Sequence, residues 1–381
     1  MAGGLMKQHS SKQIFFTLIL LTGQLSALLG CSSNNNSATG SSPDVSAATL
    51  GRKIFFDENL SANANQSCAT CHNPLAGFTD PASLKTTPVS EGSTSGRFAN
   101  RNAPTSAYAS FSPPFRLTSS PQTSEEASRY EGGQFLDGRS IDLVEQAKGP
   151  FINPLEMNNA NEAEVVNKIR NSTYANDFIS VFGESAFADN HIAYNNIAVA
   201  IAAFESTVEM NAFSSRFDAY LDDPLTNPLT ASELRGLNLF KDPGTAKCAN
   251  CHLLENPNGG PALFTNFKYY NIGTPKNPNN PDTSLDLGLG AITAEPEEDG
   301  KFKVPTLRNV ALTAPYMHNG VYETLEDVVR HYDIMVTNEF VITEVNRNIA
   351  PELNPGSYTS LGLSTQDYAD LIAFMETLTD Q

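Results

Sequence analysis

Two short cysteine motifs are the part of this chain whose residue types and spacing could do chemistry. They read Cys68-Ala69-Thr70-Cys71-His72 and Cys248-Ala249-Asn250-Cys251-His252. One helical turn between the cysteines places both sulfurs where they can form thioethers with the two vinyl groups of a haem, and the next imidazole can reach the iron. Cys-x-x-Cys-His is therefore typical of covalent attachment of a c-type haem.

Two other uses of paired cysteines fit the sequence less well. A Cys₄ zinc site would not need a histidine after each pair. A thioredoxin-like pair would lie in a βαβ unit, and no such unit is predicted here. The motifs use four of the five cysteines, and the fifth, Cys31, lies near the N-terminus. The sequence therefore predicts two c-type haems, with His72 and His252 as their iron ligands.

The residues that precede each motif repeat as well. Residues 51–57 and 236–242 both read Gly-x-x-(Ile/Leu)-Phe-x-Asp, and the two motifs begin 180 residues apart. That spacing is the size of an ordinary domain. We predict two fused cytochrome c-like domains, each with one covalently bound haem, at residues 48–220 and 221–381.

The coarse secondary structure is predicted to be mainly α. Apolar residues recur at helical spacing between Ile192 and Val208. Helix starts are indicated at Thr230, Thr324 and Ser364, each of which has an acidic residue three positions later. Sustained period-2 alternation is absent, and a long loop rich in Pro and Gly is expected at 255–299.

Length and charge limit the function classes. The chain has 381 residues, of which 40% are hydrophobic, which is enough for two cores. Its formal net charge is −18. A nucleic-acid-binding protein would need a basic surface, so that class is excluded. An acidic surface favours cationic protein partners.

The N-terminus has the pattern of an export signal. Lys7 and Lys12 precede an apolar run at 14–21 that is too short to span a bilayer. The segment ends in Leu28-Leu29-Gly30-Cys31, which resembles the lipobox of bacterial lipoproteins. We predict a lipoprotein signal peptide at 1–30, lipidation of Cys31 and a flexible tether at 31–47. The alternatives are a plain secretory signal and a membrane-spanning anchor.

The mature protein is therefore expected in the periplasm, attached to the membrane only through its lipid. Ser32, which follows the lipidated cysteine, resembles the signal for sorting to the outer membrane. Removal of residues 1–30 takes away two lysines and no acid, so the net charge changes from −18 to −20.

The sixth ligand of each iron distinguishes an electron carrier from an enzyme. A haem with two strong protein ligands transfers electrons, whereas an open distal face can bind peroxide. Apart from His9 in the signal segment and the two motif histidines, the chain contains His191, His318 and His331. None of these lies in the loop 73–110 that follows the first motif, so an open first haem is predicted.

Five further runs make the chain resemble the bacterial di-haem cytochrome c peroxidase/MauG family. They are Arg101-Asn102-Ala103-Pro104-Thr105, Phe135-Leu136-Asp137-Gly138-Arg139, Gln146-Ala147-Lys148-Gly149-Pro150, Asn153-Pro154-Leu155-Glu156-Met157 and residues 304–320. The resemblance covers about residues 48–380. It implies an oxidoreductase of the cytochrome c peroxidase type that reduces hydrogen peroxide to water.

The resemblance also implies the partners of this reaction. Electrons would come from a small redox protein, a cytochrome c or a cupredoxin. The alternatives are a MauG-like enzyme that oxidises residues of a partner protein, and a non-catalytic di-haem electron carrier.

The same resemblance assigns residues to the first haem site. The N-terminal haem reacts with peroxide beside Glu156, whose carboxylate can move a proton between the peroxide oxygens. Gln146 matches a glutamine of the distal pocket, and Pro150 matches a proline near the iron. Without the resemblance, a single glutamate would be read as a solvated surface charge.

A calcium ion between the haems is also implied by the resemblance. Its protein ligands match the side chain of Asn102 and the backbone carbonyls of Thr313 and Pro315. Calcium prefers such oxygen ligands, with waters completing the shell. The alternative is that Asn102 and Thr313 cap turns.

The distal ligand of the second, electron-transfer haem separates the subfamilies, which use methionine in the peroxidases and tyrosine in the MauG branch. Counting along the helix from Thr324 gives Tyr332, with Met335 as a second candidate on the same face and His331 as a third. Apolar packing is the alternative for the first two. His318 matches a family position near this haem that is not a ligand, and His191 is predicted to lie at the surface.

One residue departs from the family pattern. Leu136 stands where the family usually has the tryptophan regarded as the relay between the haems, and the chain contains no tryptophan. Leucine has no accessible oxidised state, so electrons must tunnel or pass through Tyr or Phe. Sharing of charge between the irons, as in MauG, is not expected through this position.

Overall fold

The computed structural model describes residues 45–81, 87–118, 128–256, 259–335, 345 and 360–381. The signal peptide, Cys31 and most of the tether lie outside these residues, so their assignments stay predictions. Within the described ranges, helices long and apolar enough to cross a membrane do not occur.

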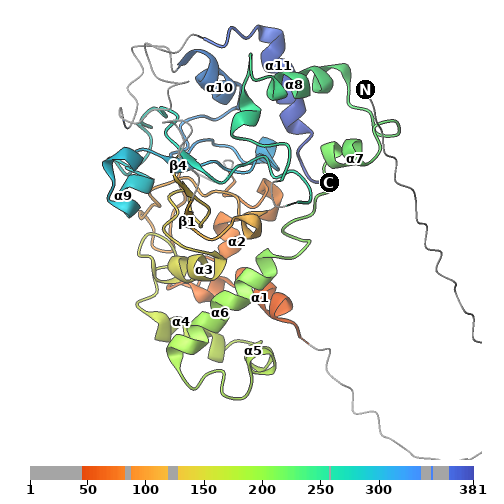
Figure 1. The fold of residues 1–381 in the computed structure, drawn as a ribbon. Helices are drawn as coiled ribbons and strands as arrows, with labels where there is room; N and C mark the ends of the chain where they lie inside the picture. The colour runs from red at the N-terminus through yellow and green to blue at the C-terminus, as the bar shows by residue number, and fades with distance from the viewer. Residues whose placement is uncertain (1–44, 82–86, 119–127, 257–258, 336–344, 346–359) are drawn as a thin grey trace, which may run out of the picture. The chain divides into compact units, whose positions relative to one another are not determined.

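Helices make up most of the regular structure. The α-helices are α1 (Ala47–Phe55), α2 (Cys68–Cys71), α3 (Leu143–Ile152), α4 (Glu162–Arg170), α5 (Ala175–Phe182), α6 (Asn190–Glu205), α7 (Arg216–Asp222), α8 (Ala231–Lys241), α9 (Leu289–Thr293), α10 (Leu325–Arg330) and α11 (Thr365–Glu376) (Figure 1). The short helices are η1 (Glu58–Leu60), η2 (Pro74–Ala76), η4 (Ala109–Phe111), η5 (Cys248–Asn250), η6 (Pro296–Glu298), η7 (Val310–Leu312) and the π-helix η8 (His331–Met335). The predicted mainly α class is confirmed.

In the described part of the chain, the strands form two antiparallel pairs, and each strand has two residues. β1 (Arg116–Leu117) pairs with β2 (Tyr130–Glu131), and β3 (Tyr269–Tyr270) pairs with β4 (Phe302–Lys303). The region 255–299, predicted as a loop, contains β3, α9 and η6, so that prediction was wrong in part. These elements are too short to produce a periodic sequence signal.

The predicted helix starts are confirmed at atomic detail. The side chains of Thr230, Thr324 and Ser364 each accept a hydrogen bond from the backbone N–H three residues later. In α8 and α11 the acidic side chain also reaches back to the cap, which completes a capping box. These caps fix where α8, α10 and α11 begin.

A close helix crossing organises the N-terminal half. α1 packs against α6, and Figure 1 shows the two helices side by side. A Cβ atom added to Gly51 would lie 1.8 Å from the Ala200 carbonyl oxygen, so only glycine permits this approach. One turn further along, the rings of Phe55 and Phe204 meet edge to face, with centroids 5.2 Å apart.

The C-terminal half repeats this crossing with α8 and α11. A Cβ atom on Gly236 would lie 1.8 Å from the Asp370 carbonyl oxygen. The centroids of Phe240 and Phe374 are again 5.2 Å apart. The repeated Gly-x-x-(Ile/Leu)-Phe sequence therefore encodes one helix-crossing geometry that the chain uses twice.

Gly236→Ala is expected to destabilise the haem-loaded protein by about 1–3 kcal/mol, because the new methyl group meets backbone atoms that cannot rotate away. Denaturant titration followed by circular dichroism measures the change. Gly149→Ala is the matched control, since a Cβ there would meet only the Phe135 ring at 3.6 Å. Equal stability of the two variants would contradict a tight crossing.

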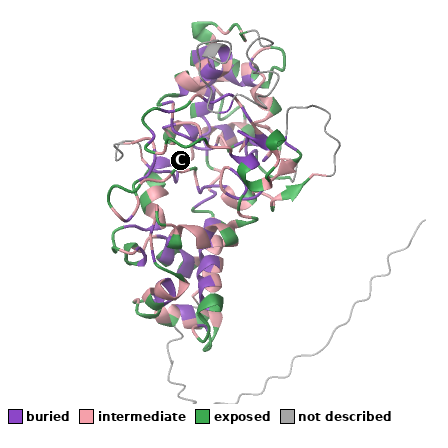
Figure 2. Ribbon diagram, turned by 90° about the vertical axis from the view of Figure 1, so that its left-hand side faces the viewer, coloured by how far each residue is buried: buried purple, intermediate pink, exposed green. Residues whose placement is uncertain are grey.

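Buried apolar residues form two clusters, and Figure 2 shows that buried segments occur throughout the ribbon. The first is built mainly from α1 and α3–α6, and the second mainly from α7, α8, α10 and α11. Leu263 and Phe267 belong to the first cluster and Phe217 to the second, so both clusters take residues from across the predicted boundary at 220/221. That boundary stays a prediction.

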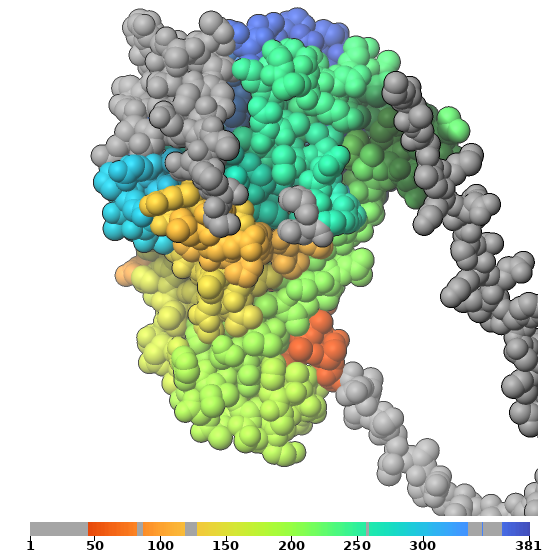
Figure 3. Space-filling view, in the orientation of Figure 1, coloured from red at the N-terminus to blue at the C-terminus, as the bar shows by residue number. Residues whose placement is uncertain are grey.

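Residues 128–132 and 259–270 connect the two halves. Ser128 N–H donates to the Tyr269 carbonyl at 3.0 Å, and Gly132 N–H donates to the Phe267 carbonyl at 2.9 Å. Figure 3 shows the surfaces of these segments meeting on one face of the molecule. These backbone hydrogen bonds tie residues 128–132 of the N-terminal half to residues 267–269, which follow the second motif.

Candidate haem sites

The first Cys-x-x-Cys-His motif forms one helical turn. α2 starts after Ser67 and ends with His72 as its C-cap, so both cysteines lie on the same turn. The side-chain hydroxyl of Thr70 accepts a hydrogen bond from the Ser67 N–H at 2.9 Å. Nδ1 of His72 donates to the Phe78 carbonyl at 3.0 Å, which leaves Nε2 as the metal-binding nitrogen.

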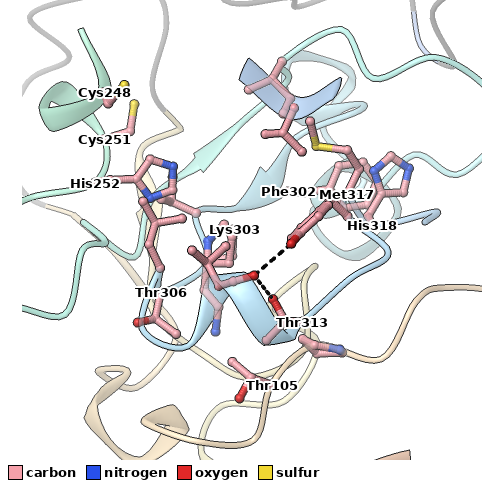
Figure 4. A pocket seen from close by; sticks show the side chains of 18 of the residues that line it. Thr105, Cys248, Cys251, His252, Phe302, Lys303, Thr306, Thr313, Met317 and His318 are labelled. Atoms are coloured by element: carbon pink, nitrogen blue, oxygen red, sulfur yellow. Dashed lines mark hydrogen bonds between the residues drawn. The ribbon is translucent and has the colours of Figure 1, made fainter. Parts of the chain in front are cut away.

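The second motif has the same side-chain arrangement on a different backbone. Cys248–Asn250 forms the 3₁₀-helix η5 rather than an α-helical turn. Nδ1 of His252 donates to the Phe264 carbonyl at 2.9 Å. Figure 4 shows the thiols of Cys248 and Cys251 beside the imidazole of His252 at one side of a cavity.

Burial keeps both imidazoles neutral. It lowers the pKa of His72 below its usual value and that of His252 to about 4, and the hydrogen bonds to backbone carbonyls only partly oppose this. A neutral imidazole with Nδ1–H held by a carbonyl is the form that binds a metal through Nε2. The residues therefore fit the iron ligation of a c-type haem at both motifs.

The cavity beside the second motif has a volume of about 390 Å³. Most of the side chains that line it are apolar, and Tyr332, Tyr316, Lys303 and His318 also contribute. His318 stacks on Phe302 with ring centroids 3.8 Å apart. A mostly apolar cavity that opens onto two thiols and an imidazole has the chemical character of a haem pocket.

Tyr332 lines the same cavity as His252. Burial raises the pKa of its phenol above the usual value, and the sulfurs of Cys251 and Cys248 nearby add to the effect. Tyr332 belongs to η8, where the helix of α10 widens into a π turn. The structure therefore brings the first candidate for the distal ligand to the wall of the second haem pocket.

The other two candidates differ. His331 is fully buried, and both of its ring nitrogens are used, at 3.0 Å from the Tyr322 hydroxyl and 2.9 Å from the Ile272 carbonyl. It has no nitrogen left for iron. Met335 is the last residue of η8, but its side chain lies outside the described part of the structure. Met335 as a distal ligand therefore stays a prediction.

Glu156 lies in the turn that follows α3, next to the first motif. Its backbone is held by hydrogen bonds from Glu156 N–H to the Asn153 carbonyl at 3.1 Å and from Ser93 N–H to the Glu156 carbonyl at 2.7 Å. Burial raises the pKa of its carboxyl, opposed by Arg139 and by a hydrogen bond with Asn153. The charge of Glu156 also raises the pKa of the Cys68 thiol, although burial and the charges of Glu205 and Cys71 have larger effects. Glu156 therefore lies in the surroundings of Cys68.

The contacts of the other residues predicted for the first haem site define their positions less closely. Gln146 and Pro150 are half-buried residues of α3, the helix that leads into the turn of Glu156. His191 is exposed at the start of α6, 3.2 Å from Glu162, as predicted for a surface residue. Of the histidines outside the motifs, none that the structure describes lies beside Cys68.

The residues predicted to bind calcium meet in space. Nδ2 of Asn102 donates to the Pro315 carbonyl at 2.5 Å, and Asn102 N–H donates to the His318 carbonyl at 2.8 Å. Thr313 lines the same cavity as Asn102 and Pro315. Rotation of the Asn102 amide would present its oxygen beside the Pro315 carbonyl, which fits the oxygen donors that calcium prefers.

Leu136 lies on the cavity wall, whereas a different segment links this cavity to the first motif. Leu136 lines the cavity, and its carbonyl accepts a hydrogen bond from Lys303 N–H at 2.8 Å. Ser106 N–H donates at 3.0 Å to the Phe78 carbonyl, the same atom that holds His72. Two residues later, Tyr108 lines the cavity. The segment 104–108 therefore joins the loop of the first motif to the wall of the second pocket without residue 136.

Among the ionisable groups near the motifs, the sequence reasoning missed Lys303 and Glu205. Lys303 lines the cavity, and burial lowers its pKa to about 7, while Asp137 opposes the shift. Glu205 is buried at the end of α6 beside Cys68. An alignment of α6 with α11, the second helices of the two crossings, would have revealed Glu205 as a candidate, because Met375 stands at the same position in the second half.

The fold and the motif geometry define a class: mainly α proteins that carry two c-type haems. The comparisons identify the family. The model for the di-haem cytochrome c peroxidase family matches residues 45–225. The methylamine utilization protein MauG of Paracoccus denitrificans is 36% identical over 362 residues, which cover 89% of each chain.

Two further relatives support the same family assignment. The cytochrome c551 peroxidase of Nitrosomonas europaea is 35% identical and covers 80% of this chain and 78% of its own. A solved tyrosine-to-methionine variant of the di-haem peroxidase BthA of Burkholderia thailandensis superposes with a TM-score of 0.78 at 34% identity, covering 88% of this chain and 86% of the other. The chain belongs to the di-haem cytochrome c peroxidase/MauG family of oxidoreductases.

Proposed function

We propose that this protein is a di-haem c-type peroxidase that reduces hydrogen peroxide to water at the first haem. Cys68 and Cys71 attach that haem and His72 binds its iron; Cys248, Cys251 and His252 do the same for the second. The observation that carries the proposal is the half-buried carboxyl of Glu156, which lies close enough to Cys68 to affect its thiol and whose own pKa is raised by burial. Family membership supports the same reaction class.

The overall reaction takes up two electrons and two protons for each peroxide and releases two waters. The bound haem supplies the redox chemistry of O–O cleavage. Glu156 accepts the proton from one peroxide oxygen and gives it to the other, which leaves as water. The hydrogen bond with Asn153 and the charge of Arg139 hold the carboxyl in place and keep its proton exchangeable. Gln146, on the helix that leads into this turn, orients the substrate.

Cys248, Cys251 and His252 would hold a second haem, at which a small redox protein, a cytochrome c or a cupredoxin, would deliver electrons. Tyr332 would bind the iron of this haem opposite His252, because its phenol lines the same cavity as His252 while both ring nitrogens of His331 have hydrogen-bond partners. A phenol of raised pKa binds iron as phenolate when the charge of the metal replaces the proton. The net charge of −18 favours a cationic donor.

Optical spectroscopy of the purified haem-loaded protein tests this proposal against a plain electron carrier. We expect a high-spin ferric band from the first haem that shifts when peroxide or cyanide is added. We also expect one low-spin haem that responds to neither. Two low-spin haems inert to both ligands in every redox state would overturn the assignment of an open first site.

A MauG-like oxidation of a partner protein is the second candidate. The 36% identity to a MauG protein and the position of Tyr332 favour it. Leu136 in place of the relay tryptophan argues against charge sharing through that residue. Incubation with peroxide and a candidate exported partner, followed by mass spectrometry of the partner, separates the two: a change in its mass supports the MauG-like activity.

We propose that calcium binds between the centres through Asn102, Thr313 and Pro315. The meeting of Asn102 with the Pro315 carbonyl supports this site. A chelator should abolish peroxide turnover, and calcium but not magnesium should restore it, because the site offers a few flexible oxygen ligands. Metal analysis should give one calcium per chain and less in Asn102→Leu. A fully active protein with no calcium would contradict the site.

We further propose that the protein is exported and anchored in the periplasm, at the outer membrane, by lipid on Cys31. The support is the basic and apolar N-terminal pattern that ends in Leu28-Leu29-Gly30-Cys31. Residues 31–47 would then act as a spacer between the lipid and the helical body.

A further inference from the structure

Glu205 is an unusual residue for the end of a buried helix. Its side chain is only 4% exposed, and Oε2 has no hydrogen-bond partner among the described residues. Burial is the sole cause of its pKa shift, to about 8. A carboxylate that is buried without a partner is costly, so the group is neutral unless a positive charge arrives nearby.

The repeated helix crossing shows what this position faces. Ala200, Phe204 and Glu205 on α6 correspond to Asp370, Phe374 and Met375 on α11, because Gly51 and Gly236 contact Ala200 and Asp370 at the same distance. Met375 is buried and lines the second pocket together with Cys248. By this correspondence, Glu205 occupies the position in the first half from which Met375 lines the haem pocket in the second half.

The electrostatics of the first motif agree with this placement. Burial is the main reason that the pKa of the Cys68 thiol is raised. Among the charged groups, Glu205 has the largest effect on this pKa. The second pocket places an apolar thioether at the equivalent position. Next to Cys68, where the first haem is attached, the chain thus has a buried glutamate that destabilises the folded protein.

We propose that Glu205 couples a proton to the charge of the first haem. When one electron from the donor protein enters that centre, one proton from solvent binds the Glu205 carboxylate; when the electron leaves, the carboxyl releases its proton. The coupling keeps the net charge of the buried pocket constant. The inference rests on attachment of the first haem at Cys68, but it does not require peroxide turnover.

Other charges around α6 do not replace Glu205 in this role. The elements packed against α6 are α1, α3, α4 and η4. Their charged groups are Arg52, paired with Glu209; Lys53, paired with Asp177; Lys148, paired with Glu145; and Glu162, Glu164, Lys168 and Arg170 on α4. In the first motif, Cys68 belongs to α2 and His72 caps it, and Glu156 lies near Cys68. None of these groups alters the pKa of Glu205, which burial alone shifts.

Potentiometric titration of the haem-loaded protein over a pH series tests the proposal. In the wild type, the midpoint potential of the first haem should fall as pH rises, approaching the limit of about 59 mV per pH unit for one proton and one electron. The fall should occur across a window near pH 8, because the oxidised centre lowers the carboxyl pKa and the reduced centre raises it.

Two variants and one control complete the design. Glu205→Met installs the residue of the second pocket, and Glu205→Gln keeps the shape of the side chain; both should flatten the slope while the second haem is unchanged. Glu209→Gln, an exposed glutamate near the end of the same helix, should keep it. A wild-type slope in Glu205→Gln would overturn the proposal.

Redox difference infrared spectroscopy gives an independent readout on the unmutated protein. Reduction of the first haem should produce the carbonyl band of a protonated carboxyl, and Glu205→Gln should lose it. Absence of that band in the wild type would contradict the coupling even if neither variant folds. A retained slope in a protein without peroxide turnover would refute the peroxidase assignment and leave this inference standing.

Discussion

Glu156→Gln is expected to lower the rate of peroxide reduction by about 100- to 10,000-fold while both haems stay attached. Glutamine preserves the size and the hydrogen bond with Asn153, but it cannot carry a proton between two oxygens. The Glu156 carboxyl suits this task because burial raises its pKa, which weakens the carboxylate's hold on solvent and strengthens its basicity toward peroxide. Steady-state oxidation of a reduced donor measures the loss.

The matched control for this variant is Glu184→Gln. Glu184 is an exposed glutamate outside the site, and its replacement should leave turnover unchanged. Haem content and the ferric spectrum of Glu156→Gln should equal those of the wild type, since attachment depends on the cysteines. Turnover within a factor of two of the wild type would remove Glu156 from the mechanism and move the search for a proton carrier to Gln146 and its surroundings.

Features that depend on local sequence were predictable. The two Cys-x-x-Cys-His motifs fix their own chemistry, and the structure adds the carbonyl partners of His72 and His252. The caps at Thr230 and Ser364 are local hydrogen bonds, so they specify the starts of α8 and α11 directly. The chain stays helical from Leu325 to Met335, so counting from Thr324 reaches Tyr332 within continuous helix, while its role as the distal ligand stays a prediction.

Features that depend on tertiary packing were not predictable in the same way. The π turn at η8 changes the spacing between Tyr332 and Met335, so a shared face inferred from an α-helical period has no secure basis there. The second motif forms a 3₁₀ turn although its cysteine spacing equals that of the first. Burial of Glu205 follows from the crossing of α1 and α6, which a single helix pattern does not reveal.

The absence of a tryptophan at Leu136 changes how the centres must communicate. The hydrogen bond from Ser106 to the Phe78 carbonyl links the His72 loop to the segment that carries Tyr108. The Tyr108 hydroxyl donates to Asp380 at 2.6 Å, and Arg308 lies 5.1 Å from its ring centroid. Backbone and aromatic groups therefore link the loop that holds His72 to Tyr108 on the wall of the second pocket, although residue 136 is a leucine.

Tyr332→Met should raise the reduction potential of the second haem and keep it low-spin. A thioether ligand favours ferrous iron, whereas a phenolate favours ferric iron. Axial ligands set haem potentials over a span of about 0.8 V, so the shift should be one of the largest that a single substitution in this chain can cause. Tyr332→Phe removes the donor atom and should instead produce a high-spin second haem that binds cyanide.

Tyr316→Phe is the control for both Tyr332 variants, because Tyr316 lines the same cavity and its hydroxyl donates to the Val310 carbonyl at 3.0 Å. It should change neither spin state nor potential. If Tyr332→Phe keeps a low-spin second haem at the wild-type potential, Tyr332 is not the ligand, and Met335→Leu should then give the high-spin spectrum. Electron paramagnetic resonance and potentiometry of the three variants distinguish the outcomes, because a phenolate and a thioether move the potential in opposite directions from a vacant site.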